Sequence, residues 1–159
     1  MFDRPDAPDD ETLLRRAIAL SVRSRNEGNH PFAALVIDAD GTQLAEAFNA
    51  SRADCTGHAE MEAVRAAWVA RPARLAGATL YSSAEPCAMC AGGIYWSGIR
   101  RVVYALSETR LLTLTGSHPE NPTLSLPCRE VFARGQRAVE VVGPLLEEDA
   151  AVAHAGFWT

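Results

Sequence analysis

The chain has 159 residues, 48% of them hydrophobic, and a formal net charge of −5, with arginine supplying all 15 strongly basic side chains. This length predicts a single domain over residues 1–159 that buries a core of its own. The acidic balance makes nucleic acid the less favoured kind of partner, and the lack of a run of 18 apolar residues predicts no membrane span.

The N-terminal segment predicts a flexible tail over residues 1–9 and then a helix. Asp9 or Asp10 can cap a helix over residues 11–26, because acidic residues favour helix starts. The apolar residues of this helix recur at helical spacing and predict one buried stripe, formed by Leu13, Leu14, Ala17, Ile18 and Val22.

A β-hairpin is expected next. Residues 32–39 and 43–48 predict two strands, joined by Asp40-Gly41, a dipeptide typical of tight hairpin turns. The hairpin makes these two strands antiparallel. The polar residues 49–57 that follow predict a loop.

Two helices in the centre of the chain are expected to open with reactive side chains. His58 begins a helix over residues 58–69, with Met61, Val64 and Trp68 toward the core. A strand over residues 78–82 leads into a second helix that opens at Cys87. This second helix is expected to be mostly buried through Ala88, Met89, Ala91, Ile94 and Trp96.

The remainder of the chain alternates strands and helices. Its pattern predicts a strand over 102–105, a helix over 107–116, a loop over 117–127, a short helical turn over 130–134, a strand over 138–142 and a helix over 145–155. Strands that alternate with helices pair in parallel, so the last three strands are expected to be parallel. The predicted fold class is α/β, a three-layer α/β/α sandwich with helices on both faces of a mixed five-stranded sheet.

Three side chains have the composition of a catalytic metal site. Cys87 and Cys90 are three positions apart, so on one helix both sulfurs can bind one ion. Pro86 suits the start of that helix, where the dipole favours thiolates. His58 adds a third ligand, and three protein ligands leave the fourth position of Zn²⁺ to water, whereas structural sites fill it.

Glu60 is the candidate catalytic residue beside this metal. Its offset of two residues from His58 points it away from that ligand, so we expect it to line the pocket and move protons. A C-x-x-C pair alone also suits a structural zinc knuckle or a redox pair, and H-x-E alone suits an ordinary helix. Both motifs in this order, with Pro86 before Cys87, favour the catalytic zinc site.

Two further cysteines are left over. Cys55 precedes His58 by three residues and is a possible fourth ligand, which would remove the position for water. Cys128 lies alone in the sequence. For both, we expect the role of a small buried apolar residue.

The order H-x-E then P-C-x-x-C is typical of zinc deaminases. With the segments 29–36, 81–87 and 92–98, these motifs resemble the cytidine deaminase-like superfamily, and within it bacterial guanine deaminases and transfer-RNA adenosine deaminases. The resemblance runs from about residue 13 to residue 105 and more loosely to the end. It implies a cytidine deaminase-like fold and one Zn²⁺ per chain, held by His58, Cys87 and Cys90.

The resemblance also implies a reaction, in which Glu60 moves protons while water replaces an amino group on a base and ammonia leaves. Asn49 would hydrogen-bond the base and Phe32 would form part of the pocket wall. Guanine deaminases of this type carry Gly-Phe-Asp-Asp where this chain has residues 116–120, so Glu120 and His118 are further candidates for substrate contacts.

The sequence leaves several substrates open. A free nucleobase or nucleoside is preferred, with a guanine-like purine first. The alternatives are a transfer-RNA adenosine deaminase, a cytosine or triazine deaminase, and a non-catalytic zinc-stabilised partner, against which Glu60 argues.

The C-terminal segment 144–159 ends in two aromatic residues, Phe157 and Trp158. They are expected either to pack on the core or to close over the bound base as a lid. The resemblance implies a homodimer. Thiolate ligands, unpaired cysteines and an N-terminus without an apolar leader predict a cytoplasmic protein.

Overall fold

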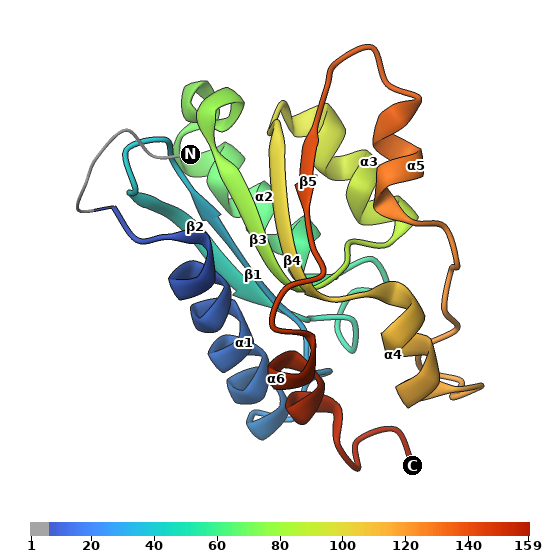
Figure 1. Cartoon of the computed structure of the whole chain (residues 1–159). Coiled ribbons are helices and arrows are strands. Elements are labelled where there is room, and N and C mark those ends of the chain that lie inside the picture. Colours follow the sequence, from blue (N-terminus) through green and yellow to red (C-terminus); the bar gives the residue numbers. More distant parts are fainter. Residues whose placement is uncertain (1–6) are drawn as a thin grey trace.

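The computed structural model describes residues 7–159, so most of the predicted N-terminal tail, residues 1–6, lies outside the described part. Its centre is a five-stranded sheet with the strand order β2-β1-β3-β4-β5 (Figure 1). The strands are β1 (Ala33–Ile37), β2 (Gln43–Phe48), β3 (Thr79–Ala84), β4 (Arg101–Leu106) and β5 (Glu140–Val142).

The strand pairing confirms the predicted mixed sheet. β1 pairs antiparallel with β2, from Ala33 opposite Phe48 onward, and also antiparallel with β3. β3, β4 and β5 are parallel to one another. The carboxyl ends of the parallel strands therefore meet at one edge of the sheet, where loops collect ligands in folds of this kind.

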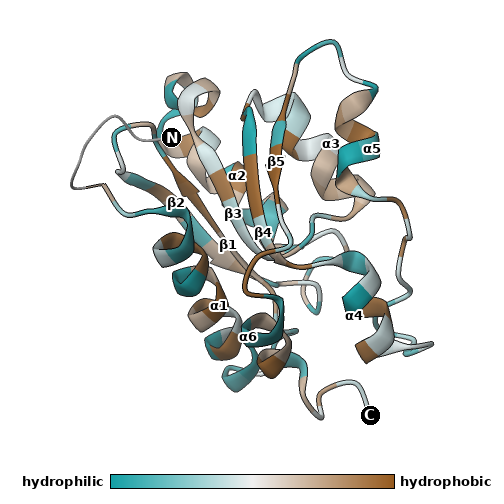
Figure 2. Ribbon diagram, viewed as in Figure 1, coloured by the Kyte–Doolittle hydropathy of each residue, from teal (hydrophilic) through white to brown (hydrophobic). Residues whose placement is uncertain are grey.

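Helices cover both faces of the sheet (Figure 1). One face carries α1 (Asp10–Asn26), α4 (Glu108–Thr115) and α6 (Glu147–Ala151), whose buried residues pack together against inward side chains of β1, β3 and β4. The other face carries α2 (Ala59–Ala70), α3 (Ala88–Ser97) and α5 (Cys128–Ala133). Figure 2 shows β1 as mostly hydrophobic, as expected for a strand buried from both sides.

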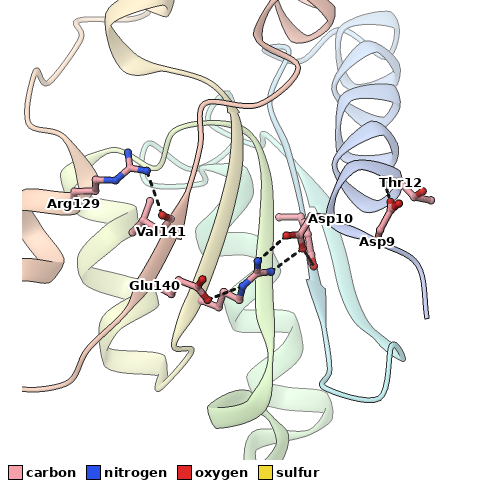
Figure 3. Close-up of polar contacts among 8 residues, drawn as sticks. Asp9, Asp10, Thr12, Arg129, Glu140 and Val141 are labelled. Atoms are coloured by element: carbon pink, nitrogen blue, oxygen red, sulfur yellow. Dashed lines mark hydrogen bonds and ion pairs between the residues drawn. The ribbon is translucent and has the colours of Figure 1, made fainter. Parts of the chain in front are cut away.

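The start of α1 is tied to the sheet. Asp9 is the N-cap, and its carboxylate accepts a hydrogen bond from the backbone N–H of Thr12 at 2.7 Å. The next residue, Asp10, forms a two-pronged ion pair with Arg101 of β4, which also contacts Glu140 of β5 (Figure 3). These contacts fix where α1 crosses the sheet.

Several expectations about buried faces are wrong. Trp68 is 54% exposed and Trp96 is 80% exposed, while Val22 and Met89 are also exposed. In α2 and α3 the sheet-facing positions are filled by small residues such as Ala63, Ala67 and Ala91, which let the helix backbones approach closely. The two tryptophans therefore lie on the outer sides of these helices, while Val64 and Ile94 are buried.

Short 3₁₀ segments account for the other differences. Residues 72–77, expected as a connection, form η1 (Pro72–Gly77), and the predicted last helix divides into α6 and η2 (Val152–His154). The predicted helical turn near residue 130 begins earlier, as α5. Within residues 7–159, no helix has the length and hydrophobicity needed to cross a bilayer.

Candidate metal centre and active site

The three predicted metal ligands meet at the starts of two helices. His58 is the N-cap residue of α2 and Cys87 is the N-cap residue of α3. Cys90 lies in the first turn of α3 and is fully buried. The backbone places both helix starts at the same edge of the sheet, because α3 follows the carboxyl end of β3 and α2 packs beside it.

The distances within this cluster fit one zinc ion. One ligand atom from each of His58, Cys87 and Cys90 lies within 4.8 Å of the other two. Nδ1 of His58 is 3.5 Å from Sγ of Cys87. Bonds of about 2.3 Å to sulfur and about 2.0 Å to nitrogen place two tetrahedral ligands roughly 3.5 Å apart. Within the described residues this is the one cluster of at least three such ligands, and its soft donors suit Zn²⁺.

Proton sharing among the ligands favours a thiolate. Hydrogen bonds from Cys90 and from the His58 ring lower the pKa of the Cys87 thiol to about 4. The contact with Cys87 raises the pKa of His58, and the hydrogen bond to Cys87, with burial, raises that of the Cys90 thiol. The thiolate is the form that binds metal, so Cys87 is prepared for a cation, whereas Cys90 would lose its proton when the metal binds.

Glu60 lies beside the cluster without belonging to it. It is in the first turn of α2 and is buried, yet it lines a cavity that also reaches His58 and Cys87. The hydroxyl of Ser82 on β3 donates a hydrogen bond to Oε1 of Glu60 at 2.9 Å, and the other carboxylate oxygen, Oε2, takes no part in this bond. Burial and the nearby Cys87 charge raise the pKa of Glu60. Ser82 was missed because a serine within a strand carries no sequence signal of a site.

The cavity has a volume of about 520 Å³, a size typical of small-molecule sites. Its floor is formed by His58, Glu60 and Cys87, and its walls come from loops and helix starts distant in sequence. The wall and rim residues include His30, Phe32, Asn49, Ser51, Arg52, Cys55, Glu85, Met89, Glu108, Leu111, Glu120, Asn121, Pro122, Thr123 and Leu124.

Phe32, predicted as part of the wall, and Asn49, predicted to hydrogen-bond the base, both line this cavity. Phe32 directly precedes β1, and Asn49 directly follows β2, where its N–H donates to the carbonyl of Phe32 at 3.0 Å. Oδ1 of Asn49 accepts hydrogen bonds from the N–H of Ser51 at 3.0 Å and from its hydroxyl at 2.7 Å. Since this oxygen is occupied, the amide nitrogen is the group that Asn49 offers to a ligand.

Of the two loop candidates, Glu120 lines the cavity and His118 does not. An oxygen of Glu120 lies 3.5 Å from Nε2 of His30, a buried ring nitrogen with no hydrogen-bond partner among the described residues. His118 instead accepts from the N–H of Glu120 at 3.2 Å and lies with its ring 5.4 Å from that of Trp158. His118 therefore shapes the loop rather than the cavity surface.

The terminal aromatics lie behind the cavity wall. Trp158 is buried, and neither it nor Phe157 lines the cavity. The Trp158 ring contacts both wall residues His30 and Phe32, with ring centroids 5.2 and 6.1 Å away. Its Nε1–H donates to Nδ1 of His154 at 3.0 Å. In this chain the segment backs the wall of its own cavity, and the predicted role of these aromatics as a lid over the base stays a prediction.

The two cysteines outside the ligand cluster, Cys55 and Cys128, differ in burial. Cys128 is buried at the start of α5, as expected. Cys55 is exposed at the cavity rim, which corrects the expectation of burial, and it does not belong to the ligand cluster. The residues 49–57 hold it outside the core because they form tight turns, closed by hydrogen bonds such as Ala50 N–H to Gly57 O at 2.7 Å.

Two wall carboxylates were also missed, although Glu85 belongs to a segment of the resemblance. Glu85 lies between β3 and Cys87, and Glu108 is the first residue of α4. Burial, with the nearby charges of Glu85 and Cys87, raises the pKa of Glu108 to about 7. No sequence motif points to Glu108, because its place in the wall depends on β4 lying beside β3.

A family model of the cytidine and deoxycytidylate deaminase zinc-binding region matches residues 7–106. The chain is 41% identical over 151 residues to a probable cytosine deaminase of Schizosaccharomyces pombe, covering 94% of this chain and 92% of that protein. It is 41% identical over 103 residues to the guanine deaminase of Bacillus subtilis, covering 62% of this chain and 65% of that protein.

The fold is likewise similar to that of a solved guanine deaminase from Nitrosomonas europaea. The TM-score is 0.78 at 25% sequence identity, and the match covers 97% of this chain and 86% of that one. The family match includes all three ligand-cluster residues and Glu60, whereas the C-terminal aromatics lie beyond residue 106.

Proposed function

This chain belongs to the family defined by the cytidine and deoxycytidylate deaminase zinc-binding region, and from that premise we propose that it deaminates a free nucleobase or nucleoside, with a guanine-like purine preferred. The family makes it a zinc-dependent hydrolase of C–N bonds in cyclic amidines. The observation that carries the proposal is the buried carboxylate of Glu60, which opens into a cavity shared with two of the ligands.

His58, Cys87 and Cys90 would hold the zinc, which supplies an activated water when bound. Glu60 would take a proton from the attacking water and give it to a ring nitrogen of the base, while the water oxygen bonds to the ring carbon that carries the amino group. Glu60 then takes the proton of the newly added hydroxyl and gives it to the amino group, which leaves as ammonia. The balance is one water consumed and one C–N bond replaced by C=O. Ser82 holds one carboxylate oxygen still during both transfers.

The locked side chain of Asn49 supports a base that carries an oxo group. Because Ser51 occupies the side-chain oxygen, Asn49 presents an N–H donor to the cavity. Guanine and cytosine offer a carbonyl oxygen to such a donor, whereas adenine offers only its ring nitrogens. A donor placed to meet an exocyclic oxygen is left unpaired by a base without one, and this favours the oxo bases.

The charge of the cavity supports a small neutral substrate over RNA. Within residues 7–159, four glutamates line it, and Arg52 is the one strongly basic lining residue. RNA binding depends on cationic groups that neutralise phosphates, and this lining offers few of them. Glu108 and Glu120 would repel the phosphates that flank a base in a transfer RNA.

Cytosine is the second candidate substrate, favoured by one specific observation. The probable cytosine deaminase of Schizosaccharomyces pombe matches nearly the whole of both proteins, at 92% of its own length, and so includes the segments beyond the zinc motifs. The match to the Bacillus subtilis guanine deaminase covers 65% of that protein. The similar guanine deaminase structure from Nitrosomonas europaea supports the purine instead.

A substrate panel tests the proposal. The zinc-loaded chain is assayed for ammonia release from guanine, cytosine, adenine, their nucleosides, ammeline and a transfer-RNA anticodon stem-loop, with the metal-stripped chain as control. We expect guanine to be the best substrate and both oxo bases to exceed adenine. Turnover of the stem-loop alone would overturn the proposal, and cytosine as the best substrate would replace guanine with the second candidate.

Assembly and location complete the proposal. We propose that residues 1–159 act as one domain and form a homodimer, since the large aromatic side chains of Trp96 on α3 and Trp68 on α2 are exposed. We also propose a cytoplasmic location, because thiolate ligands and the four unpaired cysteines suit a reducing compartment. Sedimentation of the zinc-loaded chain tests the proposed homodimer, and a monomer would contradict it.

A further inference from the structure

Glu85 connects the turn before Cys87 to three other elements, which are β4, α4 and α5. It follows β3 and precedes Cys87 by two residues. Its Oε1 accepts a hydrogen bond from the backbone N–H of Glu108, the first residue of α4, at 3.1 Å. Its Oε2 accepts one from the backbone N–H of Cys128, the first residue of α5, at 3.0 Å. The backbone N–H of Glu85 donates to the carbonyl of Leu106 at 2.7 Å.

Both bonded N–H groups lie at helix starts, where backbone donors lack partners within the helix. A carboxylate suits them because it only accepts hydrogen bonds, on two oxygens, and its charge is favourable at the positive end of α4. Glutamine could not replace it, because one of its two arms carries an NH₂ group that would face an N–H donor. The site therefore requires a glutamate rather than a neutral side chain of the same shape.

The position of Cys87 depends on what holds the turn before it. Cys87 is the N-cap of α3 but makes no side-chain capping bond, so the segments on either side determine where its backbone lies and whether its sulfur reaches His58 and Cys90. On the far side, α3 packs through Ala91 and Ile94, which are fully buried. On the near side, Pro86 connects it directly to Glu85, whose three hydrogen bonds fix the turn to β4, α4 and α5.

We propose that Glu85 is a positioning residue for the metal centre, which holds Cys87 where its sulfur meets His58 and Cys90. The inference rests on the proposed zinc site but on no particular substrate. It assigns to Glu85 the role that outer hydrogen bonds have at metal sites, where they fix the orientation of the ligands.

The test compares two variants of the full chain that each remove a cap from the same helix. Glu85→Gln removes one of the carboxylate contacts, and Ser107→Ala removes the hydroxyl that accepts from the N–H of Arg110 at 3.1 Å. Zinc affinity is measured by competition with a chromogenic chelator, and stability by urea unfolding. We expect Glu85→Gln to weaken zinc binding about 10–100-fold, the usual effect of losing such a contact, and Ser107→Ala to leave it within twofold.

Two results would overturn the role of Glu85. One is zinc affinity of Glu85→Gln within twofold of the wild type. The other is equal weakening by Ser107→Ala, which would mean that any loss of stability near α4 loosens the site. If Glu85→Gln does not fold, Glu85→Asp keeps both oxygens on a shorter stem and should weaken zinc binding by a smaller factor; unchanged affinity would again overturn the role.

The zinc measurement separates this inference from the proposed function. A wild-type chain that binds zinc but releases ammonia from no compound of the panel would defeat the proposed function, while the comparison of Glu85→Gln with Ser107→Ala would still decide the role of Glu85. A wild-type chain that takes up no zinc would defeat both.

Discussion

Two regions build the cavity in different ways. The metal floor, formed by His58, Glu60 and Cys87 of the cavity surface together with the buried ligand Cys90, comes from the starts of two helices and is set by backbone geometry. The aromatic cluster, which forms part of the wall and backs it, is held by ring packing between segments far apart in the chain. Its members are His30, Phe32, His118, His154, Phe157 and Trp158.

The metal floor therefore carries the chemistry of the site, whereas the aromatic cluster supports the shape of the cavity. Side chains of the floor each have a chemical role, so replacing one should change the reaction or the metal while leaving most packing intact. Rings of the cluster have no reacting group near the metal, so replacing one should change stability and the fit of the substrate. Each of the predictions below tests one side of this division.

The largest effect is expected from Glu60→Gln in the floor. The amide keeps the shape and a contact with Ser82 but cannot accept and return protons. We expect kcat to fall about 10²–10⁴-fold, with zinc content and urea stability near those of the wild type. Steady-state ammonia release and metal analysis measure this. Unchanged kcat would remove Glu60 from the reaction, and loss of zinc would make it a ligand.

The next effect is expected from Trp158→Ala in the cluster. Trp158 is buried and backs both His30 and Phe32, so its loss leaves a cavity and costs about 3 kcal/mol of unfolding free energy. We expect KM to rise more than kcat falls, because the wall loosens while the floor is untouched. Val152→Ala, at an apolar position in the same segment that is 67% exposed, is the matched control.

The division of roles between the metal floor and the aromatic cluster would be wrong if Trp158→Ala reduced kcat as much as Glu60→Gln while KM stayed constant. That result would place the terminal segment in the chemistry, as an element that closes over the reacting base. Equal loss of stability in Val152→Ala would instead mean that the whole C-terminal segment is weakly held.

A smaller effect concerns pH and His154. Burial, with the nearby charge of Arg25, lowers the pKa of His154 to about 4, whereas an exposed histidine titrates near 6.5. Because the folded pKa lies below the unfolded one, the stabilisation is complete above pH 6.5 and is lost as the pH falls toward 4. Protonation also breaks the hydrogen bond that Nδ1 accepts from Trp158.

Lowering the pH from 7 to 5 should therefore cost about 2 kcal/mol through this one group. Urea unfolding at a series of pH values measures it. His154→Gln keeps an acceptor for Trp158 but does not titrate, so its stability should fall by about 2 kcal/mol less over the same range. Parallel curves for the two proteins would show that His154 does not control the loss.

The sequence predicted the floor far better than the wall, for a physical reason. His58, Glu60, Cys87 and Cys90 are placed by local rules, since each lies within one turn of a helix start. The alternation of strands and helices likewise predicted that the last three strands are parallel, and Asp40-Gly41 predicted the antiparallel hairpin. Periodicity failed for Trp68 and Trp96, because it finds an apolar face without saying whether small residues on another face pack closer to the sheet.

Of the wall, the resemblance predicted Phe32, Asn49 and Glu120, which line the cavity, but the rest depends on tertiary packing. Glu108 and Ser82 become cavity or site residues only through the pairing of β4 and β3 and the crossing of α2 over the sheet. The terminal aromatics were left between core and lid, and the choice depends on His30 and Phe32, more than a hundred residues earlier. The comparison between floor and wall is thus also one between local and long-range information.

The smallest expected effect is that of Cys55→Ser, which tests whether the metal floor has a protein ligand besides His58, Cys87 and Cys90. Cys55 is exposed on the rim, three residues before His58, and lies outside the ligand cluster. The variant should keep the zinc content, kcat and stability of the wild type, whereas Cys90→Ser should lose zinc under the same conditions. Metal analysis after dialysis compares them. If Cys55→Ser lost zinc, the ion would have a fourth protein ligand, the position for water would be filled, and the floor would be a structural site.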